Sequence, residues 1–499
     1  MLNIFFNYLK TNKALYISFF IFLIVCNVYQ IINPFLAFDE IYVYSPIYNT
    51  FHQSNIYYRE LYEHRIVYGI IQDILAYIKL TPSLLIIFGI IFRYILSILC
   101  LFYIQLKGIK LNLILKLSFL IAMNFIMLAF ANNYPLMTIY FTIVSFAFFS
   151  WIIYENLHIK YYKNIAYIIF ILLGFIGISF YSGNLYFFTY LLLISYLFKI
   201  YNINFKVKNY FYIAINYIIP IILWLSLLFI IHYLVKFYYN FPNVYNNRFI
   251  QINNHYLYIK NLIPLYLQTL YIISFILILY AFKNNFKNFI IIFFSLLIFL
   301  FIPMSSDIIL HKGGTQLRLM YLHIYILCQI IWCVYLYKNF SYKWVYYILY
   351  CCLFYVIIYT FCIYFANAIS VAKVSYREKL DIINIKNKYQ ELCSKKDCKV
   401  IVYNNLPWDY YDKYKFKYFK HYININNSFL VWKWWFKEDL SYYNINISDI
   451  FYSEDLNNNK ELSEIINKKL ENNIVYPDSN AIFEENYNNI KTIFIILSR

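Results

Sequence analysis

Two adjacent carboxylates, Asp39 and Glu40, are notable because acidic residues are rare in most of this sequence. Residues 1–369 contain only 7 Asp and Glu, against 23 Lys and Arg. An ionised carboxylate can act as a general base toward a hydroxyl, and neighbouring carboxylates can share a divalent cation. The alternative is an anchor at a membrane surface or an ion pair with a nearby arginine. We favour Asp39 and Glu40 as the chemical centre and leave the metal open.

A second segment, 58–78, contains basic and acidic side chains on a predicted amphipathic helix. Its apolar residues recur at roughly helical spacing, which is typical of a helix lying on a membrane interface. Arg65 follows His64, and a guanidinium suits bidentate contact with a phosphate group. The alternative is that Arg65 reaches lipid headgroups or pairs with Glu60 and Glu63. The first reading makes Arg65 a phosphate ligand, with His64 in support.

A third segment combines basic side chains with two consecutive glycines. Asp307 and His311 precede the glycines, and Lys312 and Arg318 flank them. Because glycine permits unusual backbone angles and close approach of a ligand, this segment resembles a phosphate clamp formed by Lys312 and Arg318. The alternative is a loop anchor in which Arg318 pairs with Asp307.

Arg93 lies well inside an apolar run and is a candidate supporting residue. An arginine within a membrane helix costs at least about 2.5 kcal/mol unless it faces the bundle interior. We therefore expect a partner, either Asp73 or a backbone carbonyl, and a structural role is as consistent as a functional one.

The composition of the whole chain predicts a membrane protein. Its 499 residues are 63% hydrophobic and 13% charged, with a formal net charge of +18. So few charges exclude the disordered, fibrous and coiled-coil classes. No basic patch or RNA-binding signature is present, so we expect no nucleic-acid partner.

Runs of about 20 apolar residues predict eleven membrane-spanning helices. The first run is long and no signal-peptidase site follows it, so we expect it to be retained. The predicted spans are 14–32, 83–106, 111–130, 135–154, 164–181, 184–200, 211–237, 263–282, 287–304, 317–338 and 344–369.

The loop charges predict how these spans are oriented. With the N-terminus in the cytoplasm, the inner segments hold 14 basic residues and one acid, Glu155. The first outer loop, 33–82, holds five of the seven acids. An odd number of spans then places the remainder of the chain outside. We therefore predict a multi-span membrane domain over 1–369 and a soluble extracytoplasmic domain over 370–499.

The predicted C-terminal domain has a normal charge balance and a mixed α/β pattern. It contains 19 basic and 17 acidic residues. Two helices (375–393 and 459–472) and three strands (399–403, 429–436 and 491–497) are predicted. Cys393 and Cys398 could form a local disulfide in an oxidising compartment, the alternative being two free thiols.

This arrangement resembles the GT-C class of membrane glycosyltransferases. Like them, the sequence has an acidic motif, here Asp39-Glu40, in the first outer loop just after the first span. It also shares a predicted interfacial helix in that loop, a similar number of spans and a soluble outer C-terminal domain. The outer domain lacks a W-W-D type motif (Trp432 to Trp435 reads W-K-W-W), which argues against an oligosaccharyltransferase.

The resemblance implies a bacterial plasma-membrane enzyme that transfers a sugar from a polyprenyl-phosphate donor. The acceptor would be a surface glycan, lipid or protein. Asp39 would be the base, Glu40 would orient the acceptor or bind a metal, and Arg65, Lys312 and Arg318 would hold the donor phosphate. A polysaccharide polymerase or ligase, and a lipid-linked sugar flippase or transporter, are the alternatives.

Overall fold

The structure is a computed structural model that describes a part of the chain. The described ranges are 2–32, 81–108, 111–131, 137–180, 217–227, 265–281, 343–393, 398–406, 448–451, 459–472 and 479–497, with single positions between them. They are mostly helical and include one small sheet. They fall into two compact units, the first up to Tyr364 and the second from Phe365 onward, with Tyr77 and Ile78 grouped in the second.

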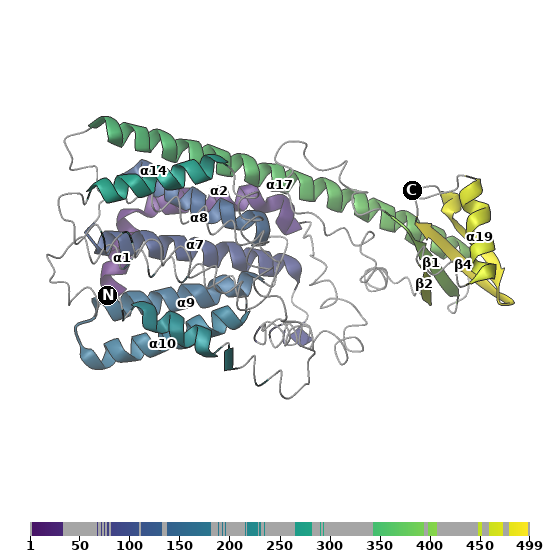
Figure 1. The fold of residues 1–499 in the computed structure, drawn as a ribbon, viewed down its shortest axis with the longest axis horizontal. Helices are drawn as coiled ribbons and strands as arrows, with labels where there is room; N and C mark the ends of the chain where they lie inside the picture. Colours follow the sequence, from purple (N-terminus) through teal and green to yellow (C-terminus); the bar gives the residue numbers. More distant parts are fainter. Residues whose placement is uncertain are drawn as a thin grey trace. The chain divides into compact units, whose positions relative to one another are not determined.

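Figure 1 labels the helices of the first unit, which consist mostly of apolar residues. Two of them begin at recognisable signals. Pro82 opens one helix after an extended Thr81, and the Asn112 side chain accepts a hydrogen bond from the Leu115 backbone N–H at 2.9 Å at the start of the next. The helices are α1 (Leu2–Thr11), α2 (Lys13–Ile32), α7 (Pro82–Leu106), α8 (Leu113–Ala131), α9 (Met137–Asn156), α10 (Lys160–Phe180), α14 (Leu265–Ala281) and, up to Tyr364, the first part of α17 (Lys343–Leu392).

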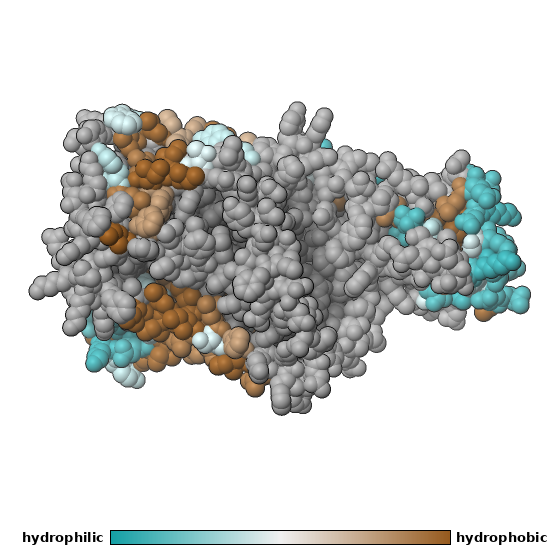
Figure 2. Space-filling view, in the orientation of Figure 1, coloured by the Kyte–Doolittle hydropathy of each residue, from teal (hydrophilic) through white to brown (hydrophobic). Residues whose placement is uncertain are grey.

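Four described helices are long and apolar enough to cross a membrane. They cover Lys13–Ile32, Ser83–Leu106, Lys160–Ser179 and a stretch within Tyr350–Leu392. Shorter apolar helices cover Leu113–Phe125, Phe141–Asn156 and Tyr217–Leu227. Apolar side chains are prominent on the surface of these helices (Figure 2), as expected for a protein associated with a membrane.

Contacts between side chains give the direction of each helix in the first unit. Helices α7 and α9 are parallel, because Ser145 contacts the Phe92 carbonyl near their middle and Tyr103 contacts Glu155 near their C-terminal ends. Helix α10 runs antiparallel to α9, since the Tyr154 ring lies 4.7 Å from Tyr167 while Trp151 packs on the later residue Phe170.

The part of α17 in the first unit runs in the same direction as α2 and α8. The Tyr364 hydroxyl donates to the Asn27 side-chain oxygen at 3.0 Å, near the C-terminal end of α2. At the other end, the Asn112 side-chain amide donates to the Tyr350 hydroxyl at 2.7 Å, just before α8 begins. Helix α2 is antiparallel to α7, because α1, which precedes α2, packs through Tyr8 on Phe102 near the end of α7.

One end of the first unit therefore collects lysines from several helix termini. The starts of α2, α8, α10 and α17 meet the ends of α7 and α9 there, and α1 packs beside them. We call it the basic end, defined by Lys10, Lys13, Lys107, Lys116, Lys160 and Lys163.

Eight of the eleven predicted spans coincide with described helices, which confirms those runs as helical. They are represented by α2, α7, α8, α9, α10, Tyr217–Leu227, α14 and the first part of α17. The runs 184–200, 287–304 and 317–338 lie almost entirely outside the described residues. The total of eleven spans and their orientation stay predictions.

One boundary between predicted elements is wrong. Residues 344–369 and 375–393 were expected to form separate helices, but α17 is continuous from Lys343 to Leu392. No Gly or Pro interrupts these 50 residues, so nothing local ends the helix. At a rise of about 1.5 Å per residue the helix is about 75 Å long, and the two compact units divide within it.

The second unit contains a four-stranded sheet with the order β2-β1-β4-β3. Its strands are β1 (Lys399–Asn404), β2 (Asp449–Phe451), β3 (Ile482–Tyr487) and β4 (Ile490–Leu497). Strand β1 is parallel to β2 and β4, and β3 is antiparallel to β4. The predicted strands at 399–403 and 491–497 are confirmed, β2 and β3 were not predicted, and 429–436 lies outside the described residues.

Helix α19 (Lys460–Glu471) covers one face of this sheet and confirms the helix predicted over 459–472. Leu462 and Ile466 of α19 are buried against a cluster that includes Ile401 and Phe494. The Asn459 side chain caps the helix by accepting from the Leu462 N–H at 3.1 Å. Alternating inward residues on adjacent strands thus provide a core for one amphipathic helix.

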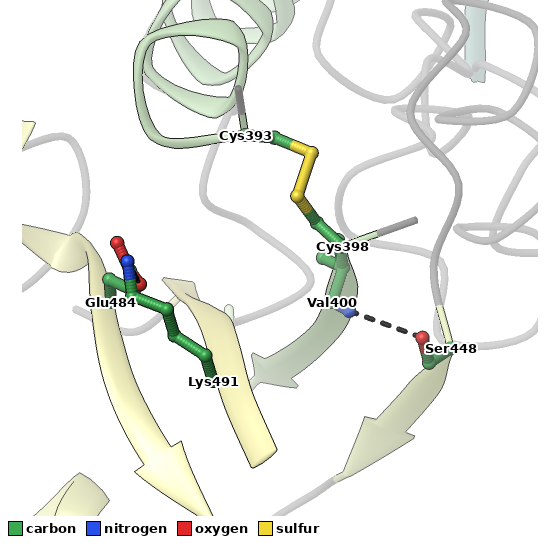
Figure 3. The surroundings of a disulfide bond; sticks show 6 residues. All are labelled: Cys393, Cys398, Val400, Ser448, Glu484 and Lys491. Atoms are coloured by element: carbon green, nitrogen blue, oxygen red, sulfur yellow. Dashed lines mark hydrogen bonds and ion pairs between the residues drawn. A yellow bond between two sulfur atoms is a disulfide. The ribbon is translucent and has the colours of Figure 1, made fainter. Parts of the chain in front are cut away.

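A disulfide joins Cys393 to Cys398 (Figure 3). Cys393 follows the last residue of α17, and Cys398 precedes β1. The bond therefore fixes the end of the long helix to the first strand of the sheet. Next to it, the Val400 N–H donates to the Ser448 hydroxyl at 3.1 Å, at the start of β2.

Candidate functional site

The residues predicted to carry the chemistry lie outside the described residues. This applies to both members of the acidic pair and to the phosphate-binding candidates with their neighbours. They are Asp39, Glu40, His64, Arg65, Asp307, His311, Lys312 and Arg318. Arg93, Cys393 and Cys398 are described, and so are several polar groups that the sequence did not single out.

Arg93 lies in the interior of α7 with 2% of its surface exposed. Its Nε donates to the Gly89 carbonyl at 3.0 Å, and its guanidinium carbon lies 5.1 Å from the centre of the Phe141 ring on α9. A backbone carbonyl was one of the two partners expected. The cation–π contact with Phe141 joins α7 to α9, which fits a structural role.

The most connected polar site among the described residues surrounds Glu155 at the basic end. Its side chain is 3% exposed, although it is the last but one residue of α9. Helical spacing places Trp151 and Glu155 on one face of α9, and Tyr103 and Lys107 on one face of α7. Because α7 and α9 are parallel, the two faces meet at their C-terminal ends.

Glu155 accepts hydrogen bonds at both of its carboxylate oxygens. Lys107 Nζ lies 2.7 Å from Oε2, and the Tyr103 hydroxyl donates to the same oxygen. The Tyr217 hydroxyl donates to Oε1. Charge-assisted hydrogen bonds of this kind offset the cost of burying a carboxylate. Lys107 also lies over the Tyr103 ring, 4.9 Å from its centre.

The hydrogen-bond network extends from Glu155 through Tyr103 to Ser195, and each of its donors points toward the carboxylate. Since the Tyr103 proton is donated to Glu155, the Ser195 hydroxyl must donate to the Tyr103 oxygen in their mutual contact. The indole N–H of Trp151 in turn donates to Ser195 at 2.9 Å. The chain of donors therefore runs from Trp151 through Ser195 and Tyr103 to the carboxylate.

This network is suited to holding helices together rather than to binding a substrate. Lys107 and Tyr103, at the end of α7, and Tyr217 donate to the two carboxylate oxygens. Trp151 of α9 and Ser195 extend the network through Tyr103. Within the described ranges, no group of three or more His, Cys, Asp or Glu side chains could hold a metal ion. We interpret the Glu155 network as a set of buried polar contacts that holds the helices together at the basic end.

From the sequence, Glu155 is distinguished only as the one acid of the predicted inner segments. A further signal is the pair of i,i+4 spacings, Tyr103 with Lys107 and Trp151 with Glu155, near the ends of two apolar runs. Such pairs place polar side chains on one helix face. Which helices meet is a property of the packing, so the spacing alone does not pair Lys107 with Glu155.

The second unit buries two further acids on α17. Glu378 is 4% exposed and Asp381 is fully buried. Arg377 Nε lies 3.3 Å from a carboxylate oxygen of Asp381, one helical turn away. These residues follow the apolar part of α17, in the stretch that belongs to the sheet-containing unit.

Comparison with known proteins gives no independent assignment. No protein-family model matches this chain, and no curated protein or solved structure is significantly similar to it.

Proposed function

We propose that this protein is an integral-membrane glycosyltransferase. It would transfer a sugar from a lipid-phosphate donor to a surface glycan, lipid or protein on the outer face of a bacterial plasma membrane. The observation that carries the proposal is the position of the acids: five of the seven in residues 1–369 lie in the segment 33–82. Asp39 and Glu40 come just after the first span.

The direction of α2 supports this location of the chemistry. Helix α2 begins at the basic end and ends at Ile32, so the chain leaves it at the opposite end, seven residues before Asp39. Because lysine-rich ends of membrane proteins face the cytoplasm, Asp39 would lie on the outer side. Glu155, the acid at the basic end, is already held by Lys107.

The direction of α17 supports an odd number of spans. In the first unit α17 runs parallel to α2, as the contacts Phe22–Phe361 and Asn27–Tyr364 indicate. A chain that makes two such passages in the same direction must return between them. The eleven spans proposed from the sequence satisfy this condition and place the sheet-containing unit outside.

The proposed reaction uses the candidate residues in defined roles. Arg65, Lys312 and Arg318 bind the donor phosphate, and Asp39 removes the proton of the acceptor hydroxyl. The acceptor oxygen forms a bond to the anomeric carbon as the bond from that carbon to the phosphate oxygen breaks. The electron pair leaves with the phosphate and the configuration inverts. Glu40 orients the acceptor or binds a divalent cation.

The test is the substitution Asp39→Asn in cells, with mass spectrometry of surface glycans and glycolipids. We expect loss of one sugar decoration at an unchanged protein level, because an amide cannot accept the hydroxyl proton. The control is Glu391→Gln, which removes an acid that is 65% exposed on α17 and should leave the decoration intact. An active Asp39→Asn variant would contradict the proposal.

Two other outcomes distinguish the alternatives in a deletion strain. Shortened surface chains with every decoration present indicate a polymerase. An unmodified lipid-linked sugar that accumulates on one side of the membrane indicates a transporter.

A further inference from the structure

The basic end of the first unit exposes apolar and aromatic side chains beside its lysines. On α1, Ile4 is 54% exposed and Phe6 is 61% exposed. At the start of α10, Tyr161 and Tyr162 are exposed. Aromatic and apolar side chains next to lysines are typical of the boundary between lipid and water. Figure 2 shows hydrophilic surface around the start of α10 as well.

Helix α1 is fixed at this end and does not continue into the bundle. The Phe5 ring lies 4.9 Å from Phe102, near the end of α7, and the Tyr8 hydroxyl is hydrogen-bonded to that of Tyr16. Asn12 separates α1 from α2, and its side-chain oxygen accepts from Lys116 Nζ at 2.7 Å. Helix α1 therefore docks through Phe5 and Tyr8 and presents Ile4 and Phe6 to its surroundings.

The lysines of the basic end divide into two groups. Lys107 and Lys116 are engaged by Glu155 and Asn12, and Lys163 lies over the Tyr154 ring at 5.0 Å. Lys10, Lys13 and Lys160 are exposed. Because Lys107 neutralises Glu155, the charge that this end presents to its surroundings is positive.

We propose that the basic end is a binding surface for anionic phospholipid. Helix α1 lies in the headgroup layer with Phe6 inserted among the acyl chains, as an interfacial helix does. Lys10, Lys13 and Lys160 contact the headgroup phosphates. The charge of the surface complements anionic lipid. This inference depends on membrane insertion and is independent of the proposed transferase activity.

The experiment measures lipid binding to the full chain in neutral detergent by native mass spectrometry. The probes are dioleoyl phosphatidylglycerol, which is anionic, and dioleoyl phosphatidylcholine, which carries no net charge. We expect tighter binding of phosphatidylglycerol. Each lysine near an anionic surface contributes about fivefold in affinity, so K10Q/K13Q/K160Q should lose much of this preference.

Two matched variants separate the surface from net charge and from misfolding. K379Q/K460Q/K468Q removes three exposed lysines of the second unit and should keep the preference. K10R/K13R/K160R retains the charge and should keep it too.

Three results would overturn the proposal: equal binding of the two lipids by the unmodified chain, an unchanged preference in K10Q/K13Q/K160Q, or an equal loss in K379Q/K460Q/K468Q. Phe6→Ser should weaken binding of both lipids alike, since it removes the inserted apolar side chain. Unaltered binding of both lipids by this variant would contradict the insertion of α1.

Discussion

Replacing Lys107 and replacing Glu155, the two members of one ion pair, should destabilise the first unit by different amounts. The Glu155 side chain is 3% exposed and that of Lys107 is 17% exposed, with the charged atoms 2.7 Å apart. After Lys107→Met, the carboxylate stays buried with the Tyr103 and Tyr217 hydroxyls as its described donors. Removing one partner of a buried pair typically costs about 3–5 kcal/mol.

Glu155→Gln should cost less, about 1–2 kcal/mol. The amide oxygen still accepts a hydrogen bond from a tyrosine, and the lysine, with its flexible stem and partial exposure, can turn toward water. The double variant carries no buried charge at this position. We therefore expect it to be more stable than Lys107→Met alone, with a clearly non-additive cycle.

The assay is equilibrium unfolding of the full chain in mixed micelles for the four members of the cycle. The matched control is the pair Lys388–Glu391, whose charged atoms lie at nearly the same distance, 2.8 Å, but which is exposed at 29% and 65%. Exposed pairs contribute at most about 1 kcal/mol, so Lys388→Met and Glu391→Gln should be nearly additive. Additive effects at Lys107 and Glu155 would refute the interpretation of this site as a buried ion pair that stabilises the first unit.

Three further predictions concern other parts of the described chain. A Cβ atom at Gly174 would clash with the Trp224 ring, so Gly174→Ala should destabilise the first unit by about 1–3 kcal/mol. Calorimetry should show partial rescue by Trp224→Leu, and no rescue would place the cause elsewhere. Replacing Cys393 and Cys398 by serine should lower the unfolding free energy of the second unit by about 2 kcal/mol, because the disulfide closes a short loop. Alkylation of intact cells should find both cysteines protected from the reagent, and free thiols there would contradict the outer location. Burial raises the pKa of the Tyr403 phenol above its ordinary value of 10.0, so the folded state holds this proton more tightly than the unfolded chain. The contribution of this proton to stability is present below pH 10 and is lost as the pH rises through the folded-state pKa. When unfolding is measured as a function of pH, Tyr403→Phe should lose less unfolding free energy at alkaline pH than the unmodified chain.

The helical elements of the first unit could be predicted closely from the sequence. An apolar run of about 20 residues is a local property, and helices such as α7 and α9 begin and end within two residues of their predicted limits. The continuity of α17 was not predicted, because the hydropathy of the sequence falls after residue 369 although its helix propensity does not. A change of environment along a helix is visible in composition, but it does not end the helix.

The sheet of the second unit was predicted in part for a related reason. Strands β1 and β4 each contain a continuous apolar run, Val400–Tyr403 and Ile493–Leu497, and lie at the centre of the sheet. Strand β2 has three residues, and β3 includes the acids Glu484 and Glu485. Edge strands with one neighbour need less apolar surface, so their periodicity is weak.

By itself, the sequence determined where the apolar runs lie and how charge divides along the chain. It showed that the acids of residues 1–369 are concentrated in 33–82 and that Asp39 and Glu40 come just after the first apolar run. These properties are local, because hydrophobicity and charge belong to each residue whatever it contacts.

The tertiary structure decided which polar side chains meet inside the first unit. Lys107 and Glu155 are separated by 48 positions, and Asn27 and Tyr364 by 337. Their contacts exist because α7 packs parallel to α9, and α2 parallel to α17. That choice depends on the fit of whole helix faces, which the spacing of residues along one helix cannot fix.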